Sequence, residues 1–487
     1  MDINSRAVIK ILGTVLLVIG FSMILPIFVG IIYKEIVSVQ AFSIVVLPSI
    51  LVGLLITKLV RPAKKQLKIR DGVFIVSLSW LIATTIGSLP FVFSGAIPNP
   101  IDAFFETCSG FSTTGASILS DIEALPKSIL FWRAFTHWLG GMGILVFAVA
   151  LLPALGISGQ LIIRAETPGP SLSKITPKIS DSARRLYILY IAFTIAETIL
   201  LMLGGLNFYD ALTHSFSTVG TGGFSNYNNS VAHFDSPYVD YVITIFMLLS
   251  GINFNLYFIL FKDNIRAFFK DGELKLYLII VISSISLLTI SLLFNKDFDT
   301  IGEAFRYASF QQASIMTTTG FATYDYNLWP TFCQVILFTL FFVGGCSSST
   351  GGGIKVIRVL ILGKLIKRSI AIRIHPTAVV KVKINNTVLP RAVVANVSNF
   401  VFLYVALVFL TGFVLSFDGH SIISNITAAA SCLGNIGPGF AEIGPTENYS
   451  LFSNTSKLFL SFVMIAGRLE LFTLLMLFAP KFWNPNK

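Results

Sequence analysis

Ten stretches of this chain are long, apolar and almost free of charge, and this feature limits the possible folds more than any other. They cover residues 8–33, 41–60, 73–93, 129–153, 186–206, 238–261, 276–294, 331–362, 393–416 and 456–480. About twenty residues of helix cross the hydrocarbon core of a bilayer, so each stretch predicts a transmembrane helix. The first stretch lacks a small-residue cleavage site and more spans follow it, so we expect it to be retained. The sequence therefore predicts an all-α polytopic membrane protein.

The segments that join these stretches differ in charge. Four of them hold 23 of the 35 Lys and Arg residues, namely 61–70, 164–185, 262–275 and 355–391. The alternate four hold only three basic residues but 13 acidic ones, namely 94–128, 207–237, 295–329 and 417–455. By the positive-inside rule this predicts a cytoplasmic N-terminus, with the acidic segments outside. Acidic outer segments favour cation transport, although solvated loops would also be polar.

Several functions are excluded by what the sequence lacks. The net charge of +11 does not indicate nucleic-acid binding, because the basic residues do not gather on one soluble surface. The four cysteines show no zinc or disulfide spacing. Neither a phosphate loop nor a GxGxxG unit occurs, so we expect this chain to bind no nucleotide. The few intramembrane charges form no nucleophile–base pair, which argues against an enzyme.

Each outer segment contains a short stretch rich in Ala, Ser, Thr and Gly. Aligned without gaps, these read SGFSTTGAS (Ser109–Ser117), STVGTGGFS (Ser217–Ser225), SIMTTTGFA (Ser314–Ala322) and SCLGNIGPG (Ser431–Gly439). A serine stands six residues before a glycine in every copy, and the glycines are Gly115, Gly223, Gly320 and Gly437. In the second copy Gly220 offers another register, but it breaks the shared serine spacing, so we prefer Gly223.

The stretches predict re-entrant segments that line a pore. Non-helical backbone at membrane depth survives only if it is buried in protein or lines water. Four such segments on one axis would present rings of carbonyls that replace the water shell of a cation. We expect a short helix before each, with Asp102 and Asp210 as N-caps in the first two copies. Close helix packing is the alternative explanation for the small residues.

The predicted architecture is four repeats of span, short helix, extended segment and span around a central pore, behind two extra N-terminal transmembrane helices. Its divisions are 1–70 for the two N-terminal helices, then 71–160, 161–270, 271–370 and 371–487 for repeats 1 to 4, with a broken second helix in repeat 3.

A family resemblance follows from FSTTGAS, HWLGGMGILVFAVALLP (His137–Pro153), TTTGFATYD (Thr317–Asp325) and GNIGPGF (Gly434–Phe440). The chain resembles the Trk/Ktr/HKT superfamily of potassium transporters, specifically its TrkH-type bacterial members, over essentially its whole length. The resemblance implies a pseudo-fourfold pore in one subunit, a homodimer, and potassium as the transported ion. The implied potassium filter comprises Thr113, Thr114, Gly115, Thr221, Gly222, Gly223, Thr318, Thr319, Gly320, Asn435, Ile436 and Gly437. Sodium-favouring relatives carry serine at the position of Gly115, so glycine there implies potassium selectivity.

The second span of repeat 3 contains a run that should break an α-helix, because each glycine costs about 1 kcal/mol against alanine. Its members are Gly344, Gly345, Ser347, Ser348, Ser349, Thr350, Gly351, Gly352 and Gly353. The resemblance implies that this run is an intramembrane loop that obstructs the pathway below the filter. A contact with a neighbouring subunit is the alternative.

Arg468 lies about halfway along the last stretch, where a charge is costly unless it faces the interior or water. The resemblance implies a cationic barrier that acts with the glycine-rich loop. Pairing with Glu470 or Glu197 is the alternative. We interpret Arg133, His137 and Trp138 as structural, with Gly140, Gly141 and Gly143 packing tightly around a pore helix.

The sequence as a whole predicts a potassium uptake channel or transporter of the bacterial inner membrane. The basic segments 154–184 and 363–391 are long enough to bind a partner. The resemblance implies a cytosolic TrkA-type regulatory ring that binds nucleotides, and binding to anionic membrane lipid is the alternative. An alternating-access, cation-coupled carrier for an organic solute is the rival function, because such carriers also have broken helices. Passive transport and proton or sodium symport both remain open.

Overall fold

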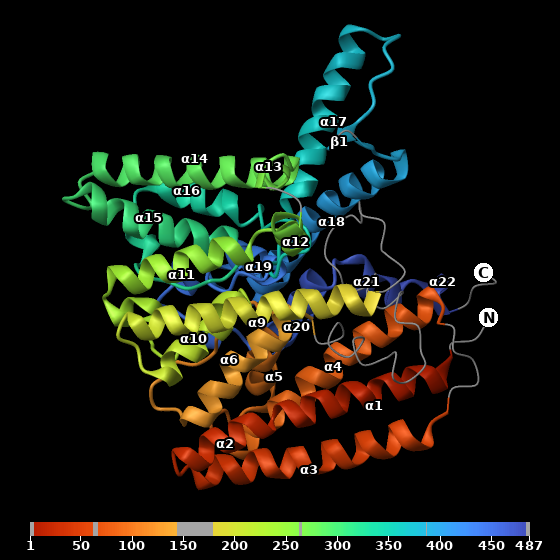
Figure 1. Ribbon diagram of the computed structural model, residues 1–487, viewed down its shortest axis with the longest axis vertical. Coiled ribbons are helices and arrows are strands. Elements are labelled where there is room, and N and C mark those ends of the chain that lie inside the picture. Colours follow the sequence, from red (N-terminus) through yellow and green to blue (C-terminus); the bar gives the residue numbers. More distant parts are fainter. Residues whose placement is uncertain (1–3, 62–66, 144–178, 263–264, 386, 484–487) are drawn as a thin grey trace.

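Long apolar helices dominate the structure, a computed structural model that describes residues 4–61, 67–143, 179–262, 265–385 and 387–483. Six helical stretches are long and apolar enough to cross a membrane. They are α1 (Ser5–Ser22) continuing into α2 (Ile24–Ile32), α3 (Ile36–Leu59), α4 (Ile69–Phe93), α9 (Ile179–Leu203), α14 (Gly272–Phe294) and α18 (Arg391–Leu415). These helices run roughly parallel or antiparallel, and α1 begins on the side of the molecule where the last helix ends (Figure 1). The predicted all-α membrane class is confirmed.

Other predicted spans are not straight. Helices α11 (Pro237–Ser250) and α12 (Phe254–Lys262) meet at a bend of 92°, and α20 (Asn454–Arg468) and α21 (Phe472–Leu475) meet at 115°. The number of candidate spans among the described residues rises to eight if each bent pair is one span. The predicted break in residues 331–362 is confirmed, because α16 (Thr331–Leu340) ends well before α17 (Val356–Ile374) begins.

Four shorter helices lie in the segments that join longer helices. They are α5 (Pro100–Phe111), α10 (Phe208–Val219), α15 (Ile301–Met316) and α19 (Ile422–Gly434), and we call them the pore helices. Each is followed by an irregular segment and then by α6 (Lys127–Gly141), α11, α16 or α20. The remainder of the predicted span 129–153, from residue 144 on, lies outside the described residues.

The predicted N-caps of the first two pore helices were wrong by three residues. Asn99 and Asn207 cap α5 and α10 through their side chains. Asp102 and Asp210 instead occupy the first helical turn, where a carboxylate favours the positive end of the helix dipole. Asp102 also forms an ion pair with Lys457 of α20, at 2.7 Å.

Large apolar side chains cover much of the outer surface. Leu47, Ile282 and Phe402 are 70%, 63% and 78% exposed. Water would disfavour so much exposed apolar area, whereas lipid would cover it. The polar threonines and serines of the pore-helix ends are buried instead. Most of the interior is hydrophobic, and the ends of these four short helices form a buried polar zone within it.

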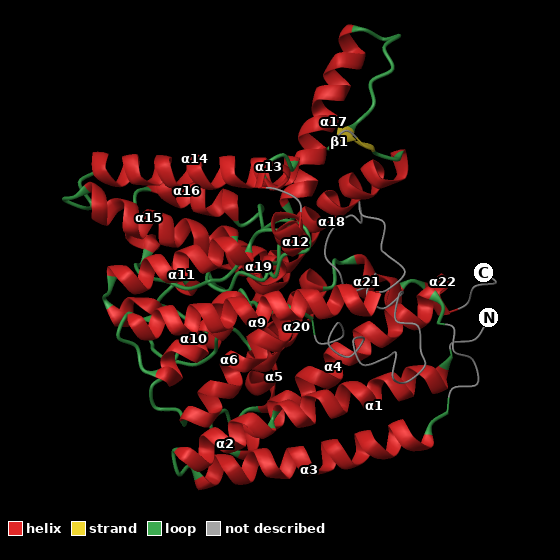
Figure 2. Cartoon of the chain, viewed as in Figure 1, coloured by secondary structure: helices red, strands yellow, loops and turns green. Residues whose placement is uncertain are grey.

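Helix α17 projects beyond the other helices and leads into the only described strands, β1 (Lys383–Ile384) and β2 (Thr387–Val388), a small antiparallel hairpin (Figures 1 and 2). Its turn reaches the start of α14: the Gly272 amide donates to Asn385 at 2.9 Å, and the Asn385 amide group donates to Asp271 at 2.7 Å. The described chain is completed by α13 (Ile265–Phe268), α22 (Pro480–Trp483) and the 3-10 turns Ser230–Phe234, Tyr326–Leu328, Ser416–Asp418, Ala441–Ile443, Tyr449–Leu451 and Met476–Phe478.

Candidate ion pathway and gate

All four pore helices end in the same way. The residue that stands two before each predicted glycine has a left-handed conformation, with φ between 54° and 60°, namely Thr113, Thr221, Thr318 and Asn435. The amide of the following residue donates to the carbonyl of the shared serine, five positions earlier, at 2.8–2.9 Å in every copy. This is the Schellman arrangement that closes a helix C-terminus. It explains the constant spacing between the serine and the glycine in the sequence.

The left-handed threonines are unusual. A β-branched residue at positive φ is a conformational outlier, and it costs of the order of 1–3 kcal/mol unless its surroundings hold it. Three of the four copies accept this strain, at Thr113, Thr221 and Thr318, which are all at most 1% exposed. Strain of this kind gathers at functional sites.

The four glycines form a closed ring. Their φ values are 80°, 80°, 84° and 103° in chain order. A β-carbon built on Gly115 would lie 2.1 Å from the carbonyl oxygen of Gly222, and one on Gly223 would lie 2.0 Å from that of Thr319. In the same way Gly320 meets Ile436 at 2.1 Å and Gly437 meets Thr114 at 2.6 Å. Each segment therefore touches the next, and the fourth touches the first.

This closure brings together all twelve residues that the sequence predicted for the filter. The residue in the ring is Gly223, whereas Gly220 caps the end of α10 with a right-handed φ of −70°. The ring leaves no room for a side chain at the four glycines, because the nearest atom to a β-carbon there is a carbonyl oxygen of the neighbouring segment. Among the described residues no group of three His, Cys, Asp or Glu side chains could hold a metal ion.

Two tyrosines support the ring, and the sequence did not predict them. The Tyr449 hydroxyl donates to the carbonyl of Gly437 at 2.7 Å, and the Tyr326 hydroxyl donates to that of Gly439 at 2.8 Å. His137 lies directly behind the second segment, since a β-carbon on Gly222 would lie 2.2 Å from its ring. These residues stand outside the repeated motif, so motif alignment gives no signal for them.

The glycine-rich loop lies directly against the ends of the pore helices. A β-carbon on Gly352 would lie 2.4 Å from the carbonyl oxygen of Gly434 in α19, and one on Gly351 would lie 2.7 Å from that of Thr317 after α15. The Gly352 amide also donates to the Thr318 hydroxyl at 2.6 Å. The loop therefore touches the residue that begins the third segment of the ring.

Two charged side chains, Glu273 of α14 and Lys355 before α17, form hydrogen bonds with the loop. The Glu273 carboxylate accepts hydrogen bonds from the amide and hydroxyl of Ser347, at 2.5 and 2.7 Å, and from the amide of Ile357 at 3.1 Å. It joins the first part of the loop to the first turn of α17. The Lys355 ammonium donates to the carbonyl of Gly351 and to the hydroxyl of Ser349. Nothing in the sequence distinguishes Glu273, which lies in the first turn of the ordinary span α14.

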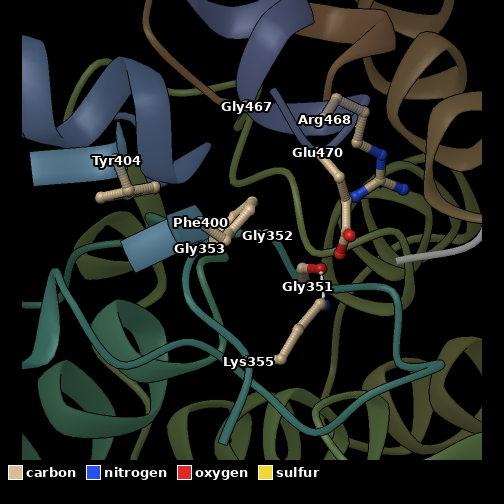
Figure 3. A pocket seen from close by; sticks show the side chains of 9 residues that line it. All are labelled: Gly351, Gly352, Gly353, Lys355, Phe400, Tyr404, Gly467, Arg468 and Glu470. Carbon is tan, nitrogen blue, oxygen red and sulfur yellow. Dashed lines mark hydrogen bonds between the residues drawn. The ribbon is translucent and has the colours of Figure 1, made fainter. Parts of the chain in front are cut away.

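Arg468 bridges the loop to another repeat. Its guanidinium donates to the carbonyl of Thr350 at 2.7 Å and to those of Gly140 and Gly141 at 2.7 and 2.8 Å. It occupies the last position of α20, at the 115° bend. Figure 3 shows Arg468 and Lys355 approaching the same small cavity, beside Gly351. Arg468 is 7% exposed, so its positive charge is buried between the glycine-rich loop and the end of α6.

The two carboxylates predicted as alternative partners of Arg468 are Glu470 and Glu197. Glu470 forms an ion pair with Arg358 of α17 at 2.5 Å, and the Arg358 guanidinium lies 3.7 Å from the ring centre of Phe400. Glu197 lies fully buried in α9, and among the described residues no ion pair joins it to Arg468. The contacts of Arg468 therefore favour the predicted association with the loop.

Gly140 and Gly141, the last two residues of α6, pack as tightly as the sequence predicted. A β-carbon on Gly140 would lie 1.9 Å from the carbonyl oxygen of Phe111, at the end of α5. We expect Gly140→Ala to lower the free energy of unfolding by about 1–3 kcal/mol, because a backbone atom cannot move aside cheaply. Thermal unfolding in detergent would measure this. Gly363→Ala is the control, since a β-carbon there meets nothing within 4 Å, and an equal loss in that variant would contradict the packing explanation.

An acidic hollow opens beside the N-terminus of the pore helix α19. It has a volume of about 530 Å³ and is lined by His420, Ala441, Glu442, Glu447 and Leu451. Hydrogen bonds from the Ser424 hydroxyl and the Ser421 amide lower the pKa of Glu442 below its ordinary value. Glu442 therefore stays ionised at neutral pH, and its charge attracts cations to this face.

Known proteins are similar to this chain in sequence and architecture. The family model TrkH, described as a cation transport protein, matches residues 38–485. The chain is 37% identical over 482 residues to the Trk system potassium uptake protein TrkH of Halomonas elongata, with 98% of this chain and 99% of the relative covered. It is 37% identical over 484 residues to the protein of the same name in Escherichia coli K12, with the same coverage. The crystal structure of the potassium transporter TrkH from Vibrio parahaemolyticus matches with a TM-score of 0.89 and 36% identity, covering 99% of this chain and 100% of that one.

Proposed function

The chain belongs to the TrkH family of cation transport proteins, and from this membership we propose that it takes up potassium through the ring of four segments. The observation that carries the proposal is the closure of the ring, in which each glycine abuts a carbonyl of the next segment. An alternating-access carrier for an organic solute gains no support. Such carriers bind their solute between two repeats at discontinuous helices, whereas here four equivalent helix ends meet in a ring.

Dehydration of the ion is the step that the ring would perform. A potassium ion that enters a narrow protein passage loses its water shell, and a ring of carbonyl oxygens can replace it. The carbonyls of Thr114, Gly222, Thr319 and Ile436 lie at the contacts between segments. The C-terminal ends of the pore helices add partial negative charge nearby. We propose that these groups form the potassium filter, together with the other eight predicted residues.

Repeat organisation follows from the same proposal. Two N-terminal helices occupy residues 1–70, and the four repeats occupy 71–160, 161–270, 271–370 and 371–487. The division between repeats 1 and 2 falls outside the described residues. The basic segments face the cytoplasm in this arrangement, which places the N-terminus inside and the acidic hollow outside.

Gating is assigned to the glycine-rich loop and Arg468. The loop contacts the third segment of the ring through Gly352 and Thr318, and Arg468 places a buried positive charge at its Thr350 carbonyl. Such an arrangement would block a cation both sterically and electrostatically. We propose that a nucleotide-binding cytosolic ring of the TrkA type opens it, and that two copies of the chain pair in the membrane. The predicted contact segment 154–184 lies outside the described residues up to residue 178.

Reconstitution in lipid vesicles tests the function. The purified chain is sealed into vesicles with potassium inside and a sodium or organic-cation salt outside. We expect potassium efflux that exceeds sodium efflux under the reversed gradient, and that rises when the cytosolic partner is added. Empty vesicles are the control. Equal movement of both ions, or none with the partner present, would contradict potassium uptake through this ring.

A further inference from the structure

One position in the pore helices carries a different residue in each repeat, and in three of the four it makes the same kind of contact. Nine residues before the glycine stand Glu106, His214, Gln311 and Ala428. The first three each reach the chain that leaves the ring on the far side of the glycine. His214 Nε2 is hydrogen-bonded to the Ser225 hydroxyl at 3.0 Å, and the Gln311 amide group donates to the carbonyl of Tyr324 at 3.1 Å.

Repeat 1 uses a charged group at this position. The Glu106 carboxylate accepts from the amide of Ile118 at 2.9 Å and from the hydroxyl of Ser117 at 3.0 Å. Both partners follow Gly115 closely in the chain. The Glu106 side chain has no exposed surface, so its charge requires a partner.

That partner is Arg133 of α6, which also reaches repeat 2. Its Nε lies 2.6 Å from Glu106, and its Nη1 donates to the carbonyl of Ser225 at 2.8 Å. The guanidinium also lies 3.7 Å from the ring centre of Phe224. Ser225 and Phe224 directly follow Gly223. One buried ion pair therefore holds two neighbouring segments of the ring, each just beyond its glycine.

We propose that Glu106 and Arg133 are positioning residues for ion discrimination. Neither lies among the twelve filter residues. They act by fixing the spacing between the first two segments, so that the Gly222 carbonyl stays against Gly115. This proposal rests on the proposed potassium filter. It replaces our interpretation of Arg133 as packing alone, since a packing residue would not need a fork that reaches two segments.

The physical reason lies in what a loosened ring would do. Sodium is smaller than potassium, and discrimination between them depends on the spacing, number and field strength of the carbonyl ligands. If Glu106 loses its charge, Arg133 is left buried without a counter-ion, and the groups around it must rearrange. This rearrangement would displace Ile118 and Ser225, which belong to the first and second segments, so both segments would shift together.

The test is the ratio of potassium to sodium flux in vesicles for Glu106→Gln. This change keeps the shape of the side chain but removes the charge. We expect the ratio to fall by about tenfold, which corresponds to the loss of one charged hydrogen bond. Misfolding of part of the sample would reduce both fluxes equally and leave the ratio unchanged, so the ratio reports positioning.

Asp102→Asn is the matched control. Asp102 belongs to the same pore helix and also forms a 2.7 Å ion pair, with Lys457, but it lies in the first turn, away from the glycine. We expect its flux ratio to equal that of the wild type. If it falls as far as in Glu106→Gln, the effect belongs to α5 in general and the proposal is overturned.

Arg133→Lys is the second variant, and it decides the matter if Glu106→Gln does not fold. Lysine keeps the charge but lacks the planar fork that reaches Glu106 and Ser225 together. We expect a smaller fall in the flux ratio. An unchanged ratio in the variants that fold, with an altered ratio in Gly115→Ser, would overturn the positioning role and leave the filter intact. An unchanged ratio in Gly115→Ser as well would instead contradict the filter itself.

Discussion

Gly115→Ser is expected to lower the ratio of potassium to sodium flux by roughly tenfold to a hundredfold. A β-carbon there would lie 2.1 Å from the carbonyl oxygen of Gly222, and that oxygen belongs to rigid backbone. The native φ of 80° is also unfavourable for serine. Both effects separate the first two segments, so the carbonyls would bind a bare potassium ion less selectively. Flux from vesicles loaded with each ion in turn measures the ratio.

Gly95→Ser is a suitable control for this change. Gly95 also has a positive φ, of 73°, but a β-carbon there meets nothing within 4 Å. It therefore carries the same kind of backbone strain without any contact to the ring, and we expect the wild-type flux ratio. If Gly115→Ser also retained that ratio, the assignment of the filter would be wrong.

Arg468→Ala is expected to increase potassium flux in the absence of the cytosolic partner by about tenfold or more. The change removes hydrogen bonds to Thr350, Gly140 and Gly141, and hydrogen bonds to a charged group contribute about 1.5–3 kcal/mol each. It also removes a buried positive charge from the proposed pathway. A shortened Gly344–Gly353 loop should have the same effect. Vesicle flux without the partner measures both variants.

Arg468→Lys separates the two roles of the arginine. If the charge is the barrier, lysine should keep the flux low. If the bridge between the loop and α6 is what matters, lysine should behave like alanine, because it lacks the fork that binds several carbonyls. Arg306→Ala serves as the control, because it removes an arginine of the pore helix α15 that pairs with Asp240 of α11, away from the loop. Wild-type flux in both Arg468→Ala and the shortened loop would contradict the gate.

The sequence predicted the ring because its signal is local and repeated. A helix end of the Schellman type fixes the distance from the serine to the glycine, so the same spacing appears in every copy. The broken third-repeat span was also predictable, since five glycines lie within ten residues, 344–353. The N-caps were misplaced because asparagine and aspartate both cap helices well, and only the backbone at Asn99 and Asn207 decides between them.

The supporting contacts could not be read from one sequence. Glu273 meets Ser347 across 74 positions, and Tyr326 meets Gly439 across 113. No periodicity links residues so far apart. The bend after Arg468 was hidden for a related reason. It occurs at Leu469–Leu471, where Glu470 and Leu471 have positive φ although nothing in their residue types favours it. Tertiary contacts therefore determine that bend.

One chain encodes all four segments of the ring, so each segment can be substituted independently of the others. In an assembly of four identical subunits any substitution would appear four times, and the symmetry would be preserved. Here Glu106, His214, Gln311 and Ala428 occupy equivalent places with different chemistry. A substitution can thus alter one segment of the ring and leave the other three unchanged. In the proposed filter, an ion would therefore be surrounded by four segments that are held with different rigidity.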